Sequence, residues 1–384
     1  MVFEGSQVQN AIYVSGQAEW PIAHEDWEER ARENLDAGAF DYIAGGAGAE
    51  LTITANREAF ERFRLRPRML SGNVERDLSI EVLGTRSEAP FLLAPIGVLA
   101  IAHRDAELAV ARASASTGVP IVLSSAASSS IEQVAEELGD APRWFQLYWP
   151  SDRDVAASLV DRAAAAGYGA IVVTLDTLLL GWRPRDLANA YLPFLSGEGC
   201  AQFFSDPVFR SRLASPPEED PLGAATMMLA SFSNLALSWD DLEWLRERVK
   251  LPLLVKGILR GDDAVRAREC GVDGVIVSNH GGRQVDGAMA ALDAYLEVRE
   301  ALGPDATVLV DGGVRTGADV LKAIALGADA VLLGRPYAYG LAVGGQAGAE
   351  AVIRQLMAET DITLALIGAS AARDLDRSWI AASS

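Results

Sequence analysis

Short runs of Val, Ile and Leu recur along most of this chain, and each run ends in a polar or turn-forming residue. A stretch rich in Ala and Glu, with the spacing of an amphipathic helix, follows each run. The spacing between most runs is about that of one strand plus its return helix. The pattern predicts eight strands, at residues 91–95, 120–124, 144–148, 170–176, 252–256, 274–279, 307–311 and 330–334.

Eight strand-helix units in series favour a closed parallel barrel, the (β/α)8 or TIM barrel fold, over an open sheet. An open doubly wound sheet is the alternative, and it usually carries a Gly-rich dinucleotide loop after its first strand. Here residues 94–97 read Ala-Pro-Ile-Gly, which does not have that pattern. We therefore predict a single α/β barrel domain.

The barrel is expected to span residues 81–345, between an N-terminal helical extension (1–80) and a C-terminal helical segment (346–384). Within the extension, we expect residues 1–23 to be irregular and helices at residues 25–39 and 51–63.

The strand-helix rhythm breaks once, between the fourth and fifth strands. Long loops in compact domains are usually functional, so we predict that residues 184–234 form a lid loop over the site. A tolerated surface insertion is the alternative, because lengthening a surface loop costs little free energy.

Charge and cysteine usage narrow the classes of partner. The formal net charge is −20, so nucleic acid and anionic membrane surfaces are repelled on average, and an anion site needs its own arginines or lysines. The two cysteines, Cys200 and Cys270, have neither disulfide nor metal-ligand spacing, so we predict no metal site and a reducing cytoplasm. The apolar stretch 91–102 is too short to span a bilayer, and the N-terminus lacks the pattern of a signal peptide.

The candidate chemistry lies at the predicted strand ends, where the active sites of such barrels are found. The sixth strand delivers Ser278 and His280 to its end, and two glycines then precede Arg283. A histidine exchanges a proton near neutral pH, and an arginine can hold a carboxylate through two parallel hydrogen bonds. The cluster predicts proton transfer on an anionic substrate. The alternative is a strand-capping histidine beside a solvated arginine.

The last two strands end in the motifs Asp-Gly-Gly-Val-Arg (311–315) and Gly-Arg-Pro (334–336). Loops at these places commonly bind phosphate, because glycines expose backbone N–H groups and arginine adds charge. We expect a phosphorylated cofactor or substrate there. Turn glycines with surface arginines are the alternative.

Lys256 ends the apolar fifth strand. A buried lysine is either a Schiff-base nucleophile, as in an aldolase-like lyase, or a fixed positive charge that suits a reduced flavin. The sequence pattern leaves both roles open.

Taken together, these motifs resemble the signature of the FMN-dependent α-hydroxy acid oxidising family. The resemblance runs from about residue 41 to the C-terminus. It rests on Ser-Asn-His-Gly-Gly-Arg-Gln (278–284), Phe-Gln-Leu-Tyr (145–148), Thr-Leu-Asp-Thr (174–177), Leu-Val-Lys-Gly (254–257) and the two phosphate motifs. The resemblance implies an FMN-binding barrel that oxidises an L-2-hydroxy acid with oxygen as acceptor, assembled as a homotetramer or homo-octamer.

By matching position, the resemblance implies that His280 is the base and that Asp176 orients it and stabilises its charged form. Lys256 would stabilise reduced flavin, and Tyr148 completes the catalytic set. The substrate would be bound by Tyr42, Arg183, Arg283 and Tyr148. The cofactor would be bound by Pro95, Ile96, Gly97, Ser124, Gln146, Thr174, Lys256, Ser278, Asp311, Gly313, Arg315, Gly334 and Arg335.

Residues 94–98, 181–187 and 206–209 are similar to the lactate 2-monooxygenase branch of the family, which implies oxidative decarboxylation. Glycine at position 97 is that branch's residue, and it would leave room beside the flavin. The alternative is an oxidase that releases keto acid and hydrogen peroxide. A Schiff-base lyase using Lys256 and a non-catalytic binding barrel are further alternatives.

Two positions depart from the branch. Ala126 and Leu178 stand where larger residues are expected, so the substrate could be bulkier than lactate. The alternative is that neighbouring side chains refill the space.

Overall fold

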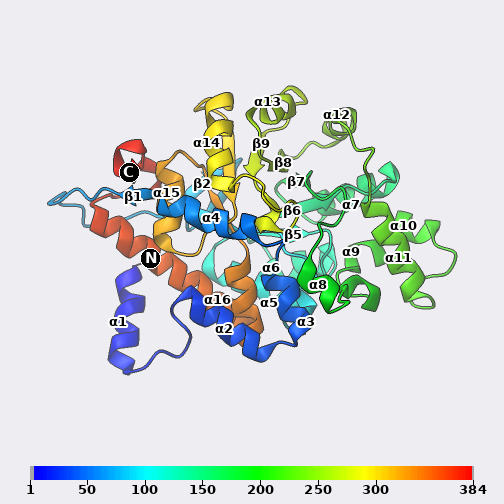
Figure 1. Cartoon of the computed structure of the whole chain (residues 1–384), viewed down its shortest axis with the longest axis horizontal. Helices are drawn as coiled ribbons and strands as arrows, with labels where there is room; N and C mark the ends of the chain where they lie inside the picture. The colour runs from blue at the N-terminus through cyan, green and yellow to red at the C-terminus, as the bar shows by residue number, and fades with distance from the viewer. Residues whose placement is uncertain (1–3, 383–384) are drawn as a thin grey trace.

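A closed barrel of eight parallel strands forms the centre of the computed structural model, which describes residues 4–382 (Figure 1). The strands occur where the apolar runs predict them, and the predicted TIM barrel is confirmed. In chain order they are β4 (Phe91–Leu93), β5 (Ile121–Ser124), β6 (Arg143–Tyr148), β7 (Ile171–Thr174), β8 (Leu253–Ile258), β9 (Gly274–Val277), β10 (Thr307–Asp311) and β11 (Val331–Leu333). The last strand, β11, pairs with the first, β4, and this pairing closes the barrel.

One helix follows each barrel strand and covers the outside of the barrel. The last one bends at Gly344 and Gly345, whose backbone angles are not helical. These helices are α5 (Ala106–Thr117), α6 (Ile131–Leu138), α7 (Arg153–Ala165), α12 (Trp239–Arg248), α13 (Gly261–Glu269), α14 (Ala291–Leu302), α15 (Gly317–Ala325) and α16 (Arg335–Ile367).

A short hairpin closes the N-terminal end of the barrel. Strands β2 (Ile80–Val82) and β3 (Thr85–Ser87) pair antiparallel, and the hairpin's apolar side chains join the cluster inside the barrel. The indole Nε1 of Trp144, fully buried in that cluster, donates a hydrogen bond to Thr85 Oγ1 at 2.8 Å. Because the hairpin fills the N-terminal end of the barrel, a ligand site can form only at the end where the carboxyl ends of the strands lie.

The long connection between β7 and β8 contains five further helices before α12. They are α8 (Pro184–Ala188), η2 (Pro193–Ser196), α9 (Ala201–Phe204), α10 (Pro207–Arg212) and α11 (Pro221–Phe232), and α9, α10 and α11 appear in green on the right of Figure 1. We call residues 184–234 the insertion. Asp206 caps α10 and also accepts hydrogen bonds from Ser158 and Arg162 of α7, so the insertion is tied to the barrel wall.

The N-terminal extension differs from its prediction in two places. Residues 5–15, expected to be irregular, form α1 (Gly5–Ser15), which packs against α16; residues 1–3 lie outside the described range. The helix expected at 25–39 is two helices, α2 (His24–Asn34) and α3 (Ala37–Ala44), because Leu35 and Asp36 adopt extended backbone angles. The second predicted helix is confirmed as α4 (Leu51–Glu61).

The C-terminal segment is helical only as far as Ile367. Two single-turn 3-10 helices, η4 (Ala372–Asp374) and η5 (Arg377–Trp379), then lead to strand β12 (Ile380–Ala382). Strand β12 pairs antiparallel with β1 (Phe63–Leu65), so the segment after α4 and the end of the described chain form one small sheet.

Asp361 on α16 holds two distant parts of the chain. Its fully buried carboxylate accepts the backbone N–H of Gly5 at 2.8 Å and two N–H groups of Arg76 at 2.7 and 3.0 Å. We expect Asp361→Ala to lower the free energy of unfolding by about 3 kcal/mol, because it leaves the partly buried guanidinium of Arg76 and the backbone N–H of Gly5 without their partner. Urea denaturation measures this, with the exposed Asp140→Ala as control. Equal stabilities of the two variants would contradict the prediction.

No helix within residues 4–382 has both the length and the apolar character needed to cross a membrane.

Candidate active site

A cavity opens at the carboxyl ends of the barrel strands, and most of the residues predicted for the site line it. It is bounded by loops that follow the strands and by parts of the N-terminal extension and the insertion. The predicted residues in its wall are Tyr42, Pro95, Ile96, Gly97, Tyr148, Arg183, Lys256, His280, Arg283, Asp311, Gly313, Arg315, Gly334 and Arg335.

His280 begins the single turn η3 (His280–Gly282) directly after β9. Its φ angle is +59°, a left-handed conformation that is uncommon for residues other than glycine and is often found at functional sites. Two side chains fix this turn: Ser278 Oγ accepts the His280 N–H at 3.0 Å, and Asn279 Oδ1 accepts the Gly282 N–H at 3.1 Å. The histidine is therefore held in one orientation.

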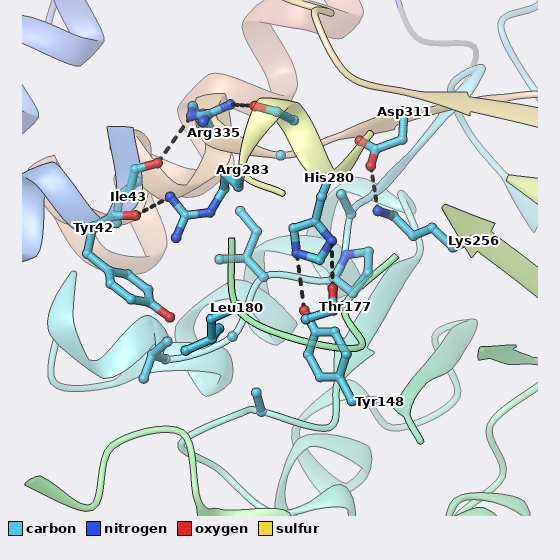
Figure 2. A pocket seen from close by; sticks show the side chains of 18 of the residues that line it. Tyr42, Ile43, Tyr148, Thr177, Leu180, Lys256, His280, Arg283, Asp311 and Arg335 are labelled. Carbon is cyan, nitrogen blue, oxygen red and sulfur yellow. Dashed lines mark hydrogen bonds and ion pairs between the residues drawn. The ribbon is translucent and has the colours of Figure 1, made fainter. Parts of the chain in front are cut away.

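The two nitrogens of His280 face different partners. Nδ1 lies 2.8 Å from Oδ1 of Asp176, and a carboxylate only accepts, so Nδ1 carries the proton. Nε2 lies 3.2 Å from the Tyr148 hydroxyl, and Figure 2 shows the ring facing Tyr148 and Thr177. A neutral histidine therefore presents its free lone pair at the tyrosine hydroxyl.

Burial and neighbouring charges together set the pKa values of this pair. Burial lowers the pKa of His280, and the nearby Asp176 opposes that change without cancelling it. Burial would raise the pKa of Asp176, but His280 and Lys256 outweigh it and hold that pKa below its usual value. Near neutral pH the site therefore holds a neutral imidazole beside an ionised carboxylate, which is the arrangement of a general base.

Two arginines lie side by side on the other side of the cavity. Arg283 donates to the carbonyls of Tyr42 and Gly45, and its guanidinium lies 4.9 Å above the Tyr42 ring centre. Arg183 Nε donates to the Arg283 carbonyl at 3.0 Å. Burial and the Arg183 charge lower the pKa of Arg283 to about 9. Such a cationic pair favours a carboxylate ligand.

A second cationic corner contains Arg315 and Arg335. Arg335 donates to the carbonyls of Ile43, Gly281 and Gly45 at 2.9 to 3.1 Å. Burial and the Arg335 charge lower the pKa of Arg315 to about 10. These are partly buried positive charges beside a glycine-rich loop, in which Gly313 has a φ of +85°.

His24, at the start of α2, also belongs to this corner, and no sequence motif predicts its place there. Burial first, and then the charges of Arg315, Arg57 and Arg335, lower the pKa of His24 to about 2. The histidine is therefore neutral here, and the corner's positive charge comes from its arginines.

Lys256 forms a triangle with two predicted residues. Its Nζ lies 2.8 Å from Asp311 Oδ2 (Figure 2) and 2.9 Å from Ser278 Oγ, which in turn donates to Asp311 at 2.8 Å. Burial would lower the pKa of Lys256, but Asp311 and Asp176 outweigh it and raise that pKa. The amine is therefore a fixed cation, and a Schiff-base nucleophile requires the neutral form. This disfavours the lyase alternative.

Three predicted cofactor residues form a buried chain under the cavity and do not line it. Ser124 Oγ donates to Gln146 Oε1 at 3.1 Å, and Gln146 Nε2 donates to Thr174 Oγ1 at 3.0 Å. Asp176 and Ser278 do not line the cavity either, but they hydrogen-bond His280 and Lys256, which do. Direct flavin binding by the three-residue chain stays a prediction.

The apolar wall of the cavity was missed from the sequence. It is formed by Leu179, Leu180, Leu192, Phe194, Leu229 and Phe232. Four of these belong to the insertion: Leu192 and Phe194 lie at η2, and Leu229 and Phe232 lie on α11. No local sequence pattern shows that these four side chains turn toward the cavity. Leu178, expected near the pocket, does not line it, whereas Ala126 does. The Phe232 ring contacts Tyr148 edge-on, with 5.5 Å between ring centres.

Gly97 and Ala126 fit closely against each other. A Cβ atom added at Gly97 would lie 2.9 Å from both the Cβ and the carbonyl oxygen of Ala126. The space beside Gly97 is therefore filled on the Ala126 side, and any extra room lies toward the cavity.

These features meet the requirements of FMN. The side chain of Arg315 makes one hydrogen bond within the described chain, to the Val314 carbonyl, so N–H groups of this partly buried guanidinium remain for a phosphate. Arg335 adds charge, and Lys256 supplies a cation for the reduced ring.

Comparison with known proteins agrees with this geometry. Residues 31–382 match the model of the family described as FMN-dependent dehydrogenase. This chain belongs to that family. It is 46% identical over 364 residues to an L-lactate oxidase from Nostoc sp., and the aligned region covers 94% of this chain and 98% of that protein. It is 42% identical over 363 residues to human 2-hydroxyacid oxidase 1, with coverages of 94% and 96%.

Solved structures give the same result. An oxidised active mutant of (S)-mandelate dehydrogenase matches with a TM-score of 0.83 and 38% identity, covering 94% of this chain and 99% of that one. Mandelate oxidase with (S)-4-hydroxymandelic acid also matches with a TM-score of 0.83, at 37% identity and with the same coverages. The family resemblance is confirmed, and the chain is an FMN-dependent α-hydroxy acid oxidoreductase. Its placement in the lactate 2-monooxygenase branch stays a prediction.

Arg315 offers a test of the phosphate corner. We expect Arg315→Met to raise the FMN dissociation constant by about tenfold to a hundredfold, because one charged hydrogen-bonding group is lost. Titration of the FMN-free protein, followed by flavin fluorescence, measures this constant. Arg30→Met, at an exposed arginine, is the matched control. An unchanged constant in Arg315→Met would show that the phosphate binds elsewhere.

Proposed function

We propose that this protein oxidises an L-2-hydroxy acid with an apolar side chain to the 2-keto acid, with oxygen as the final electron acceptor. Bound FMN supplies the acceptor for the two electrons. The observation that carries the proposal is the His280–Asp176 pair, 2.8 Å apart, beside two adjacent arginines in one cavity. A base and a carboxylate clamp together match an anionic substrate that must lose a proton.

In this proposal His280 takes a proton from the substrate at Nε2, the nitrogen that faces the Tyr148 hydroxyl. Asp176 stabilises the imidazolium that results, since its own pKa is held low. Arg183 and Arg283 hold the substrate carboxylate, and Tyr42 and Tyr148 hydrogen-bond the carboxylate and the hydroxyl of the substrate. Lys256 remains protonated throughout and stabilises negative charge on the reduced cofactor.

The apolar wall supports a substrate with a hydrophobic side chain. Ala126 and Gly97 are small, and the leucines and phenylalanines of the wall carry no polar group. Relatives named L-lactate oxidase and solved structures named mandelate oxidase act on a small and an aromatic 2-hydroxy acid, respectively. We propose that this cavity accepts side chains larger than the methyl group of lactate.

The fate of the product distinguishes two candidates. Release of keto acid and hydrogen peroxide is the first, and it is supported by relatives named L-lactate oxidase and 2-hydroxyacid oxidase. Oxidative decarboxylation is the second, and it is supported by Gly97 in the wall and by the insertion, which contributes to the walls of the cavity and can retain the keto acid.

Anaerobic addition of substrate tests the proposal. The visible absorbance of bound FMN should bleach with L-lactate or with an aromatic L-2-hydroxy acid, and not with the D-enantiomer. Failure to bleach with small, branched and aromatic 2-hydroxy acids alike would refute it. With oxygen and L-lactate, equimolar pyruvate and peroxide indicate the oxidase, whereas acetate indicates the monooxygenase.

We also propose, from the family resemblance and the cysteine usage, a homotetramer or homo-octamer in the cytoplasm. Light scattering of the purified protein measures the assembly.

A further inference from the structure

The side chain of Gln284 joins the two segments that carry the site. Its Nε2 donates to the carbonyls of Asp176 and Leu179 at 2.7 and 2.8 Å. Its Oε1 accepts the backbone N–H of Gly181 at 3.2 Å and Nη2 of Arg183 at 3.0 Å. A glutamine amide has two donors and two acceptor sites, so its hydrogen-bonding capacity is fully used.

The four partners all lie between β7 and α8, whereas Gln284 itself follows the turn that contains His280 and Arg283. The site has two halves, a histidine-aspartate pair and an arginine pair, and each half takes one residue from each segment. His280 faces Asp176 across the gap between the segments, and Arg283 faces Arg183. One side chain therefore spans the gap on which both the base and the clamp depend.

The backbones are also close at this point. A Cβ atom added at Gly181 would lie 2.5 Å from the Arg283 carbonyl oxygen and 2.7 Å from that of Gln284. The close approach requires glycine at position 181. The fit of the two segments is thus tight, and small shifts would change both the histidine-aspartate and the arginine-arginine geometry.

We propose that Gln284 is a positioning residue for the reaction, acting on both halves at once. Its two donated bonds hold the backbone of Asp176 and so keep the carboxylate against His280. Its accepted bond from Arg183 keeps that guanidinium beside Arg283. This inference rests on the proposed function, because it assigns the first contact to proton transfer and the second to substrate binding.

Two substitutions separate the halves. Glutamate at position 284 has nearly the same shape and still accepts from Gly181 and Arg183, but it cannot donate to the carbonyls of Asp176 and Leu179. We expect Gln284→Glu to slow anaerobic FMN reduction at saturating substrate by about tenfold to a hundredfold, while the substrate dissociation constant changes by less than about threefold.

Methionine at position 284 makes none of the four bonds. We expect Gln284→Met to slow reduction to a similar extent and, in addition, to raise the substrate dissociation constant by about tenfold, because Arg183 is released. Since Asp176 raises the pKa of His280, its displacement should also move the acid limb of the Gln284→Met reduction rate to lower pH.

Gln355→Glu is the matched control. Gln355 likewise bridges segments, accepting from Trp27 and donating to the Pro21 carbonyl, but it lies on α16 away from the cavity wall. It should leave both constants unchanged. Gly181→Ala is a second way to lower both the reduction rate and the substrate affinity, because the added methyl group separates the two segments without altering Gln284.

Stopped-flow absorbance, expressed per bound FMN, gives both constants. A rate loss without an affinity loss in Gln284→Glu, with loss of both in Gln284→Met, supports the inference. The inference is overturned if both variants keep the wild-type reduction rate and substrate dissociation constant. It is also overturned if the loss of rate and the loss of affinity stand in the same proportion in the two variants. If neither glutamine variant folds, Gly181→Ala decides in the same way, with wild-type constants again overturning it. Wild-type protein that no 2-hydroxy acid reduces would refute the proposed function instead.

Discussion

Substitution of His280 by glutamine is expected to slow the reduction of bound FMN by a 2-hydroxy acid by about 10⁴-fold. Glutamine can preserve a hydrogen bond to Asp176 or Tyr148, but it cannot accept a proton. The effect should appear in the rate of anaerobic reduction at saturating substrate, because Arg183 and Arg283, which we propose hold the substrate carboxylate, are untouched. FMN content should remain at the wild-type level, since Arg315, Arg335 and Lys256 are unchanged.

The control for this variant is His103→Gln. His103 lies before α5, where its Nδ1 accepts the N–H of Asp105 at 3.1 Å, and it does not line the cavity. A His280→Gln protein that reduces its FMN within about tenfold of the wild-type rate would exclude His280 as the base. Loss of rate in both histidine variants would point to a general effect on folding.

Substitution of Asp176 by asparagine should give the second-largest loss, about a hundredfold to a thousandfold in the reduction rate. Asparagine retains the shape and an acceptor for the Nδ1 proton of His280, and only the negative charge is removed. In the proposed mechanism, that charge stabilises the imidazolium formed when His280 accepts the proton. The variant therefore tests the charge rather than the contact.

The pH dependence gives an independent measure of the same pair. His280 must be neutral to act, and burial lowers its pKa from the usual 6.5, so the wild-type rate should persist to pH values below that value. Removing the Asp176 charge lowers the pKa of His280 further. The acid limb of the rate profile should consequently move to lower pH in Asp176→Asn even as the plateau falls. A limb that moves to higher pH, or stays fixed, would contradict the pairing.

The barrel could be predicted from the sequence because its signals are local. Runs such as Val-Ile-Val at 275–277 have strong strand propensity, and each helix follows its strand directly. The site followed from the fold, because parallel strands in a barrel bring all their carboxyl ends to one rim. Residues as distant in sequence as Tyr42 and Arg335 could thus be assigned to one cavity.

Features that depend on contacts between distant residues had no such signal. Strands β1 and β12 have three residues each, and nothing in either segment predicts the other. Helix α1 was expected to be irregular, although Asp361 holds its first residue from the far end of the chain. The apolar wall of the cavity and the role of Gln284 likewise depend on how the insertion and the turns fold back, which spacing along the chain does not encode.

The pairing of β1 with β12 has a consequence for the order of events during synthesis. The catalytic turn is braced by the N-terminal extension, because the side chains of Asn56 and Asn279 exchange hydrogen bonds of 2.8 and 2.9 Å. Helix α4, which carries Asn56, leads into β1, and the partner of β1 is residues 380–382. A ribosome must therefore synthesise residues 380–382 before the strand that follows α4 can find its partner, so nascent chains truncated before residue 380 should contain barrel strands but leave β1 unpaired.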